Sequence, residues 1–389
     1  MRSVILGGGI FGVTTALALY QEGWDVVLID VGTIPHPLAA TTDISKIIRL
    51  DYGTDGDYVA LMEEAIDGWR RWNDELGASL FHETGVLFLR SKPLETGGFE
   101  YDSIQSLTAR GHAVQLLDAA EIRSRYPAWN TDLYPFGYFN PVGGFARSGE
   151  VLAALVQRAR DLGVHVRTGQ GIFRPWLHSG RVLGVVSDRG EFVHSDIVVV
   201  AAGAWTGKLV PHIAQAFRTP GQPVVHFQPK DTRLFDADRF PVFAADISQT
   251  GYYGFPLHPN GVLKIANHGP GRMVDADDSV RHVLEHELKE IVEFAHNALP
   301  GLVDSAVVDT RLCLYCDSWD GHFWIAGDPD HSGLYVVAGG SGHGFKFAPT
   351  IGKLVLDCIA KKDTPYIKKF GWRPELRPPR IAEEARRQP

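Results

Sequence analysis

The sequence predicts an α/β fold combined with α+β elements, in which a Rossmann-like nucleotide-binding domain is interleaved with a second domain on a mixed sheet. Apolar runs predict buried parallel strands near residues 1–30, 197–202 and 334–338. The segments between them alternate apolar and polar residues, as antiparallel strands do. We therefore expect a first domain of residues 1–83, 146–218 and 325–389, and a second of residues 84–145 and 219–324.

The chain opens with a predicted strand–helix–strand unit, formed by residues 3–6, 13–23 and 24–30. Further helices are predicted at residues 58–75, 101–110, 119–125, 148–162 (with Ser148 as N-cap), 280–298 and 347–360. Further strands are predicted at residues 85–89, 197–202, 224–228, 252–257, 262–266 and 334–338. Residues 137–146 are predicted to form a glycine-rich loop, and the charged tail after Lys361 is expected on the surface.

Composition excludes several classes of protein. Hydrophobic residues make up 44% and charged residues 22% of the 389 residues, which is typical of globular domains. The net charge of −8 argues against nucleic acid as the main partner. No apolar run is long enough for a membrane span or a signal peptide. Three cysteines do not suggest a disulfide framework, so we expect a reducing compartment, the cytoplasm. We also expect a monomer.

The first predicted turn carries a dinucleotide-binding motif. Gly7, Gly9 and Gly12 fit G-x-G-x-x-G between a strand and a helix, and Asp30 ends the next strand at the distance expected for a ribose partner. The alternative is a glycine-rich turn in an ordinary α/β fold. The motif alone does not separate NAD from FAD, but its position in the chain favours FAD. The lack of a second copy argues against a flavin reductase with two nucleotide sites.

A second glycine cluster, residues 339–344, follows the predicted strand at residues 334–338 and precedes a helix. Successive backbone amides and the helix dipole favour negative charge in such a nest. An anionic reduced flavin is the kind of group that it would stabilise. The alternative is a tight helix entry without a ligand.

Several stretches resemble the D-amino-acid-oxidase superfamily of FAD amine oxidases, in the branch of monomeric sarcosine oxidase, fructosyl amino acid oxidases, and pipecolate and saccharopine oxidases. The matching stretches are residues 7–12, 43–53, 203–205, 253–256, 263–264, 313–315 and 341–347. The resemblance implies an FAD domain, a substrate domain on a mixed sheet, and a flavin attached through a thioether to Cys313. From the residues alone, Cys313 and Cys316 could instead be a buried thiol pair, and a zinc site would need two further ligands, so no metal is expected.

The motifs and the resemblance together predict the cofactor-binding residues. They are Gly7, Gly9, Ile10, Phe11, Gly12, Asp30, Ser45, Lys46, Ile172, Gly203, Trp205, Cys313, Gly340, Gly342, His343, Gly344 and Lys346.

The resemblance also implies catalytic and substrate-binding residues. Arg49 and Lys346 match a pair of cations that holds the substrate carboxylate; the alternatives are a surface salt bridge and an exposed helix lysine. Lys264 matches a lysine that promotes the reaction with oxygen, and its alternative is a lysine pointing outward from its strand. His268, Tyr253 and Tyr315 match residues around the substrate amine; for the tyrosines, ordinary core packing is the alternative.

The resemblance does not select one substrate. Ser45-Lys46 is similar to fructosyl amino acid oxidases, and residues 140–146 and 372–375 favour the same relatives more weakly. Cys313-Leu314-Tyr315 is instead similar to sarcosine oxidases. The chain is therefore a mixed case within the branch.

The predicted activity is FAD-dependent oxidation of the C–N bond of a secondary-amine or N-substituted amino acid of sarcosine, pipecolate, saccharopine or fructosyl type. The imine is hydrolysed and oxygen is reduced to hydrogen peroxide. The alternatives are a dehydrogenase of the same fold with another electron acceptor, a tRNA-modifying relative, which the negative charge disfavours, and a non-enzymatic nucleotide-binding module.

Overall fold

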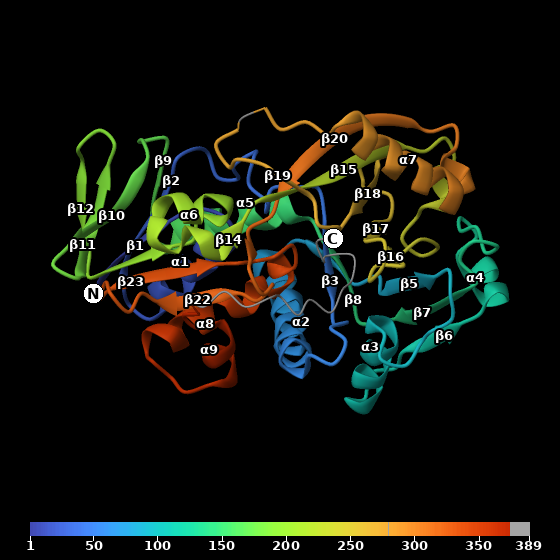
Figure 1. Cartoon of the computed structure of the whole chain (residues 1–389), viewed down its shortest axis with the longest axis horizontal. Coiled ribbons are helices and arrows are strands. Elements are labelled where there is room, and N and C mark those ends of the chain that lie inside the picture. Colours follow the sequence, from blue (N-terminus) through green and yellow to red (C-terminus); the bar gives the residue numbers. More distant parts are fainter. Residues whose placement is uncertain (279, 374–389) are drawn as a thin grey trace.

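The computed structural model describes residues 1–278 and 280–373, which contain two large sheets (Figure 1). The first sheet has the strand order β22-β23-β13-β1-β2-β9. All neighbours are parallel except β22 and β23, which are antiparallel. The strands are β1 (Arg2–Leu6), β2 (Asp25–Asp30), β9 (His165–Thr168), β13 (Ile197–Val200), β22 (Trp324–Gly327) and β23 (Leu334–Ala338). The predicted parallel strands are therefore confirmed.

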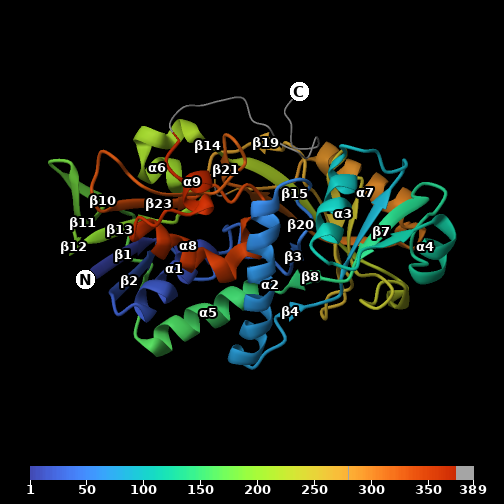
Figure 2. The same cartoon turned by 90° about the horizontal axis from the view of Figure 1, so that it is seen from below.

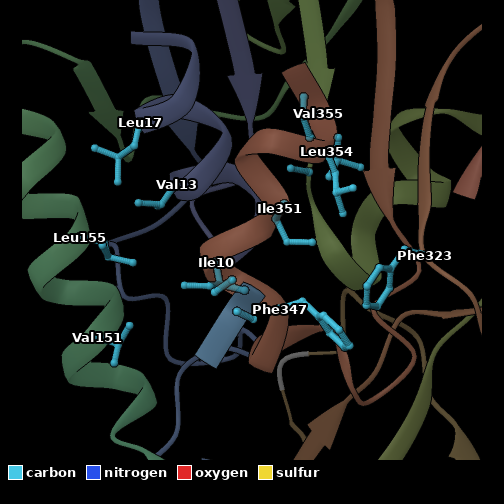
Figure 3. Packing of buried hydrophobic residues seen from close by; sticks show 14 of the residues in the cluster. Ile10, Val13, Leu17, Val151, Leu155, Phe323, Phe347, Ile351, Leu354 and Val355 are labelled. Carbon is cyan, nitrogen blue, oxygen red and sulfur yellow. The ribbon is translucent and has the colours of Figure 1, made fainter. Parts of the chain in front are cut away.

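The central strands of the parallel sheet are apolar because both of their faces are covered, whereas the edge strand β9 is mostly polar and only partly buried. On one face, α1 (Ile10–Gln21), α5 (Ser148–Leu162) and α8 (Ala348–Ile359) pack their side chains together, as Figure 3 shows for Val13, Leu155 and Ile351. The other face is covered by a three-stranded sheet of β10 (Phe173–His178), β11 (Arg181–Ser187) and β12 (Phe192–His194). Burial on both faces explains why these strands lack alternation in sequence.

The second sheet is mixed and, in the described part of the chain, has nine strands. Its order is β19-β15-β18-β17-β16-β5-β7-β6, and β20 also pairs with β15. Only the β16–β5 pair among these is parallel. The strands are β5 (Val86–Arg90), β6 (Gln115–Leu117), β7 (Phe136–Asn140), β15 (Pro220–Gln228), β16 (Val242–Ala245), β17 (Tyr252–Gly254), β18 (Leu263–Asn267), β19 (Arg272–Met273) and β20 (Ala306–Leu314).

A small sheet, β3-β8-β4, lies between the two large ones (Figure 1). It consists of β3 (Lys46–Arg49), β4 (Phe81–His82) and β8 (Gly143–Ala146). The long helix α2 (Gly56–Leu76) runs beside it, as Figure 2 shows. Because β3 carries Lys46 and Arg49, this small sheet brings two predicted site residues to the junction of the large sheets.

The remaining elements are short. The helices are α3 (Phe99–Ala109), α4 (Ala119–Arg125), α6 (Thr206–Leu209), α7 (Glu285–Ala298) and α9 (Pro365–Phe370). The 3₁₀ turns are η1 (Gly203–Trp205), η2 (Pro211–Ala216), η3 (Thr232–Leu234), η4 (Pro300–Leu302) and η5 (Gly344–Phe347), and β14 (Phe217–Arg218) pairs with β21 (Asp317–Ser318). Within the described ranges, none of the helices is both long and apolar enough to cross a membrane.

The predicted loop at residues 137–146 is wrong, because the structure forms β7 and β8 there. The glycines that suggested a loop instead allow close strand approach. Gly144 has φ +149°, and a Cβ on it would lie 2.1 Å from the carbonyl oxygen of His82. Glycine is therefore required inside this strand by packing.

Three other element predictions need correction. Ser148 is the first residue of α5 and not its N-cap, which is Arg147; the Ser148 hydroxyl donates to the carbonyl oxygen of Asp43 at 2.8 Å. The helix predicted at residues 280–298 begins only at Glu285. The tail is not wholly on the surface, because Phe370 at the end of α9 is buried in the core. Residues 374–389 lie outside the described residues, and the domain boundaries stay a prediction.

Candidate active site

A cavity of about 510 Å³ extends from the end of β2 to the small sheet and the mixed sheet. Most of the predicted site residues line it. They are Gly7, Gly9, Ile10, Phe11, Asp30, Lys46, Arg49, Ile172, Gly203, Trp205, Tyr253, His268, Tyr315, Gly340, Gly342, His343, Gly344 and Lys346. Four predicted residues are not part of its lining, namely Gly12, Ser45, Lys264 and Cys313, whereas Cys316 is.

The dinucleotide motif forms one end of the cavity. Gly7 has φ +111°, and a Cβ on Gly12 would lie 1.9 Å from the carbonyl oxygen of Gly7, so Gly12 serves packing between strand and helix. The Asp30 carboxylate accepts from the amides of Gly8 at 2.7 Å and Gly32 at 3.0 Å. Each of its oxygens has a further lone pair for a ribose hydroxyl. The N-terminus of α1 lines the same end, and this arrangement fits the pyrophosphate and ribose of FAD.

The second glycine cluster forms the middle of the cavity. Gly339, Ser341 and Gly342 have positive φ angles of 67°, 45° and 74°. A Cβ on Gly342 would lie 2.2 Å from Cε2 of Tyr315, so a larger residue would displace a wall of the cavity. The segment passes from β23 into η5 and α8, which confirms the predicted strand, glycine nest and helix. A flat ring can approach this backbone closely.

Two buried cations line the opposite end. The residues Arg49 and Lys346 are only 6% and 5% exposed, which excludes the surface alternatives for both. The Arg49 guanidinium donates to the carbonyl oxygen of Asp51 and lies 5.2 Å from the ring centroid of Tyr52. The Lys346 ammonium donates to the Tyr52 hydroxyl at 3.3 Å. Two cationic side chains that line one cavity can bind an anion, and a guanidinium can hold a carboxylate with two parallel hydrogen bonds.

Tyr52 was not singled out from the sequence, although it lies in a stretch that carries the resemblance. Its hydroxyl is 3.1 Å from Nδ1 of His343, and Nε2 of His343 is 3.0 Å from the carbonyl oxygen of Gly321. A carbonyl oxygen only accepts, so we assign the hydrogen to Nε2 and the acceptor role to Nδ1. The Tyr52 hydroxyl then donates to His343 and accepts from Lys346.

A buried acid, Asp51, lies beside Arg49 at this end of the cavity. Asp51 accepts hydrogen bonds from the Tyr138 hydroxyl at 2.9 Å and the Asn140 amide at 3.4 Å. Burial raises the pKa of Asp51, and the neighbouring Arg49 opposes that shift. The acid therefore restrains the backbone and side chains around Arg49.

An aromatic wall adjoins the two cations. Nδ1 of His268 lies 3.2 Å from the Tyr315 hydroxyl, and the rings of Tyr253 and His268 are 6.5 Å apart. Burial raises the pKa of Tyr253 well above its ordinary value, so this phenol stays neutral. The three side chains present hydroxyl and imidazole groups to the cavity, as expected for a site that binds an amine.

Lys264 points inward from the middle of β18 and is 1% exposed, so the alternative of an outward strand lysine is wrong. Its ammonium donates to Oδ2 of Asp43 and to the carbonyl oxygen of Ser45, both at 2.6 Å. Burial lowers the pKa of Lys264 to about 8, although Asp43 acts in the opposite direction. Asp43 is a second residue that sequence reasoning did not single out.

The two neighbouring cysteines differ in their surroundings. Cys313 is buried at the end of β20 and packs in a cluster with Tyr253 and Tyr315, whose side chains line the cavity. Cys316 lines the cavity itself, and burial raises the pKa of its thiol to about 12. Both thiols are free in the structure. The hydroxyl of Ser45 is buried without a partner among the described residues, which leaves it available to a bound group.

One cluster elsewhere has the residue types of a metal site. The side chains of His212, Asp328 and His331 come together among the described residues. Nε2 of His212, however, lies 2.5 Å from Oδ2 of Asp328, which is a hydrogen-bond distance. Two ligands of one zinc ion would lie roughly 3.3 Å apart, given bonds of about 2.1 Å in a tetrahedron. The structure therefore shows a hydrogen-bonded acid and imidazole at this position.

The glycine-rich turn at the edge of the parallel sheet and the cavity that adjoins it define a dinucleotide-binding fold of two interleaved sheets. The family described as FAD dependent oxidoreductase matches residues 2–358, and the chain belongs to this family. It is an FAD-dependent oxidoreductase of the amine or amino-acid oxidase type.

Individual relatives agree with this assignment. The chain is 28% identical over 395 residues to L-saccharopine oxidase of Schizosaccharomyces pombe, covering 92% of this chain and 89% of that protein. It is 27% identical over 358 residues to monomeric sarcosine oxidase of a Bacillus species, covering 90% of each. A modified fructosyl peptide oxidase from Aspergillus nidulans has the same fold, with a TM-score of 0.87, 22% identity and coverage of 100% and 96%. The relatives named here as oxidases differ in the substrates their names state.

Proposed function

We propose that this enzyme oxidises the C–N bond of an N-substituted or secondary-amine amino acid and reduces oxygen to hydrogen peroxide. The observation that carries this proposal is the pair Arg49 and Lys346, two buried cations on one cavity that share Tyr52 as a neighbour. A carboxylate is the substrate group that such a pair binds, and the guanidinium can do so with two parallel hydrogen bonds. The names of the relatives, which include saccharopine and sarcosine oxidases, support an amino acid substrate.

FAD, when bound, accepts two electrons from the substrate and passes them to oxygen. The chain's own residues then have three tasks. Arg49 and Lys346 hold the carboxylate and so fix the position of the carbon that loses hydrogen. His268 and Tyr315 line the same cavity as the two cations, which supports a role beside the substrate amine, and the imidazole can accept the amine proton. The glycine nest at residues 339–344 provides backbone amides that favour negative charge.

The proposed reaction balances in two steps. The substrate loses a hydride equivalent from carbon and a proton from nitrogen and becomes an imine, while oxygen gains two electrons and two protons and becomes hydrogen peroxide. Water then adds to the imine carbon, and the C–N bond breaks to give a carbonyl compound and an amine. Sarcosine, pipecolate, saccharopine and fructosyl amino acids all have the C–H and N–H groups that these two reaction steps require.

We also propose that FAD is attached to Sγ of Cys313 by a thioether. The position of Cys313 next to Tyr253 and Tyr315 supports this assignment, and the cavity position of Cys316 makes it the alternative. Forming the bond removes one hydrogen from the thiol and one from the flavin, and oxygen accepts them with their electrons. In denatured Cys313→Ser the yellow colour should leave with the supernatant, whereas in Cys316→Ser it should stay with the protein. The opposite pattern would assign the link to Cys316.

The decisive experiment is a peroxide assay on the purified yellow enzyme under air, with sarcosine, pipecolate, saccharopine and fructosyl amino acids as candidates. The matching amines that lack the carboxylate are the controls. Peroxide from one of the acids, but not from its decarboxylated counterpart, supports the proposal. Turnover with an artificial electron acceptor but without peroxide would instead establish a dehydrogenase. Absence of turnover with both acceptors across the N-substituted acids would reject the proposed substrate class.

A further inference from the structure

Asp43 lies at the centre of a buried cluster of charges. Its Oδ2 is 2.6 Å from Nζ of Lys264 and 3.3 Å from Nζ of Lys46, while its Oδ1 accepts from the amide of Ile44 at 2.8 Å. The side chains of Asp43 and Lys264 are 2% and 1% exposed. Both carboxylate oxygens are therefore engaged, and the contact to Lys264 has one defined geometry.

The backbone around Asp43 is fixed independently of that contact. Its carbonyl oxygen accepts from the Ser148 hydroxyl at 2.8 Å and from the amide of Gly149 at 2.9 Å, both in the first turn of α5. Lys264 comes from β18 in the mixed sheet, where it pairs with His226 of β15. The ion pair thus joins the segment before β3 to the middle of the mixed sheet, on the side of the cavity that holds Tyr253 and Tyr315.

A buried ammonium needs a partner to remain charged, because burial favours its neutral form. The charged and titratable groups around Lys264 include Asp43, Lys46, the Cys313 thiol and, on β15, His226, and Asp43 is the main one that favours protonation of Lys264. Arg311 acts on Asp43 in the same way as the two lysines. The Asp43 carboxylate thus faces three cationic side chains, and positive charge held there stabilises negative charge that develops beside it.

We propose that Asp43 is a positioning residue for the reaction with oxygen, whose carboxylate holds the side chain of Lys264 in place and keeps its amine positively charged. The inference rests on the proposed function, in which oxygen accepts the electrons. A fixed positive charge stabilises the negative charge that develops as oxygen is reduced, and it needs no reorganisation at that moment. Neither Asp43 nor Lys264 is part of the cavity lining, and the Asp43 carboxylate contacts the Lys264 ammonium directly, so its proposed effect on the reaction passes through that contact.

Separate measurement of the two half-reactions tests this role. The variants are Asp43→Asn, Lys264→Met and, as a matched control, Glu100→Gln. Glu100 is another buried carboxylate that pairs with a cation, Arg90 at 3.1 Å, but it does not line the cavity. In anaerobic stopped-flow experiments, Asp43→Asn should be reduced by substrate within about twofold of the parent rate. Its reoxidation by oxygen at neutral pH should be slower by roughly tenfold or more.

The pH profile distinguishes a lost charge from a disturbed fold. Without the carboxylate, Lys264 should hold its proton only in more acidic solution, so reoxidation of Asp43→Asn should recover as the pH is lowered. Lys264→Met should reoxidise slowly at every pH. Asp43→Glu should restore much of the rate at neutral pH, and it replaces Asp43→Asn if that variant does not fold.

A second readout does not depend on activity. In protein labelled with carbon-13 at lysine Cε, the Lys264 signal is assigned by its absence from Lys264→Met. Its titration midpoint should fall by about two pH units or more in Asp43→Asn and stay unchanged in Glu100→Gln. An unchanged midpoint and unchanged reoxidation in Asp43→Asn, with Lys264→Met impaired, would overturn the role of Asp43. Normal reoxidation in Lys264→Met would instead overturn the oxygen role of the lysine.

Discussion

The hydroxyl of Tyr52 lies 3.3 Å from Nζ of Lys346, while the ring of the same tyrosine lies 5.2 Å from the Arg49 guanidinium. One side chain therefore contacts both cations at the end of the cavity that we propose binds the substrate. The two cations come from distant parts of the chain, β3 and η5, and meet only in the folded protein. Tyr52 thus lies in contact with both cations, and its hydroxyl also contacts His343 in the glycine nest.

We expect Tyr52→Phe to weaken substrate binding with little effect on chemistry. The variant keeps the ring under Arg49 but removes the hydroxyl that accepts from Lys346, a hydrogen bond worth about 1 kcal/mol. A loss of about 1 kcal/mol corresponds to a roughly fivefold rise in KM, because about 1.4 kcal/mol corresponds to a factor of ten in a dissociation constant. We expect kcat to stay within about twofold. Steady-state kinetics measures this split. Tyr366→Phe, which removes a hydroxyl far from the cavity lining, is the control. A fall in kcat at constant KM would contradict the positioning role.

Arg49→Met should affect the enzyme much more strongly. The substitution removes a charge-assisted contact to the substrate carboxylate, worth about 1.5–3 kcal/mol. It also leaves the Asp51 carbonyl oxygen without this donor. We expect kcat/KM to fall roughly 10- to 100-fold for an acid substrate. The absorbance spectrum of bound FAD should persist, and the residual activity should no longer distinguish the acid from its decarboxylated analogue. A variant that keeps that preference would show that Arg49 does not bind the carboxylate.

Gly12→Ala should abolish FAD binding or folding of the first turn. Its Cβ would lie 1.9 Å from the carbonyl oxygen of Gly7, a distance that requires the turn to move. Gly56→Ala is the matched control, because a Cβ there meets nothing within 4 Å. Gly56 begins α2, where alanine is favoured over glycine by about 1 kcal/mol. The ratio of flavin to protein absorbance after purification measures the outcome. Full occupancy in Gly12→Ala would contradict the close packing of α1 on β1.

The reaction with oxygen should depend on pH through Lys264. Its pKa in the folded protein is lowered to about 8, so its amine is charged below that pH and neutral above it. The reoxidation rate should therefore be high at neutral pH and fall as the pH rises through about 8. Stopped-flow reoxidation across this range measures the midpoint, and Lys264→Met should lack this transition. A parent profile without a transition near pH 8 would contradict the assigned role.

Protonation of Lys264 also makes the free energy of unfolding depend on pH. The lysine loses its proton at about pH 8 in the folded chain but near its ordinary pKa of 10.5 when unfolded. Between these values the unfolded state binds more protons, so this group's contribution to the free energy of unfolding increases with pH. Chemical denaturation measures the free energy of unfolding of the parent and of Lys264→Met across this pH window. Between about pH 8 and 10.5 this free energy should rise less, or fall more, in Lys264→Met than in the parent. Parallel profiles would indicate an unperturbed lysine.

Much of the cofactor end could be predicted from the sequence, because its requirements are local. The turn at Gly7 and Gly12 and the carboxylate of Asp30 belong to one continuous strand–helix–strand unit, whose period and glycine spacing are visible in the chain. The same holds for the strand, glycine nest and helix around residues 334–359. The resemblance additionally indicated Arg49, Lys264 and Lys346, but it carried no information about their partners.

Tertiary structure alone decided how the charges are compensated. Asp43 and Lys264 are 221 residues apart in sequence and meet at 2.6 Å, and Tyr52 reaches Lys346 across 294 residues. Long-range contacts of this kind leave no period in the sequence. The prediction of a loop at the glycine-rich strand β8 is wrong for the same reason. Its glycines allow the backbones of other strands to approach closely, and those neighbours are not visible in the sequence. The sequence by itself determined which local units form and which cations the site contains. The packing of two sheets determined which of those cations are buried and which acid, tyrosine or carbonyl oxygen compensates each charge, because burial makes an uncompensated charge too costly to keep.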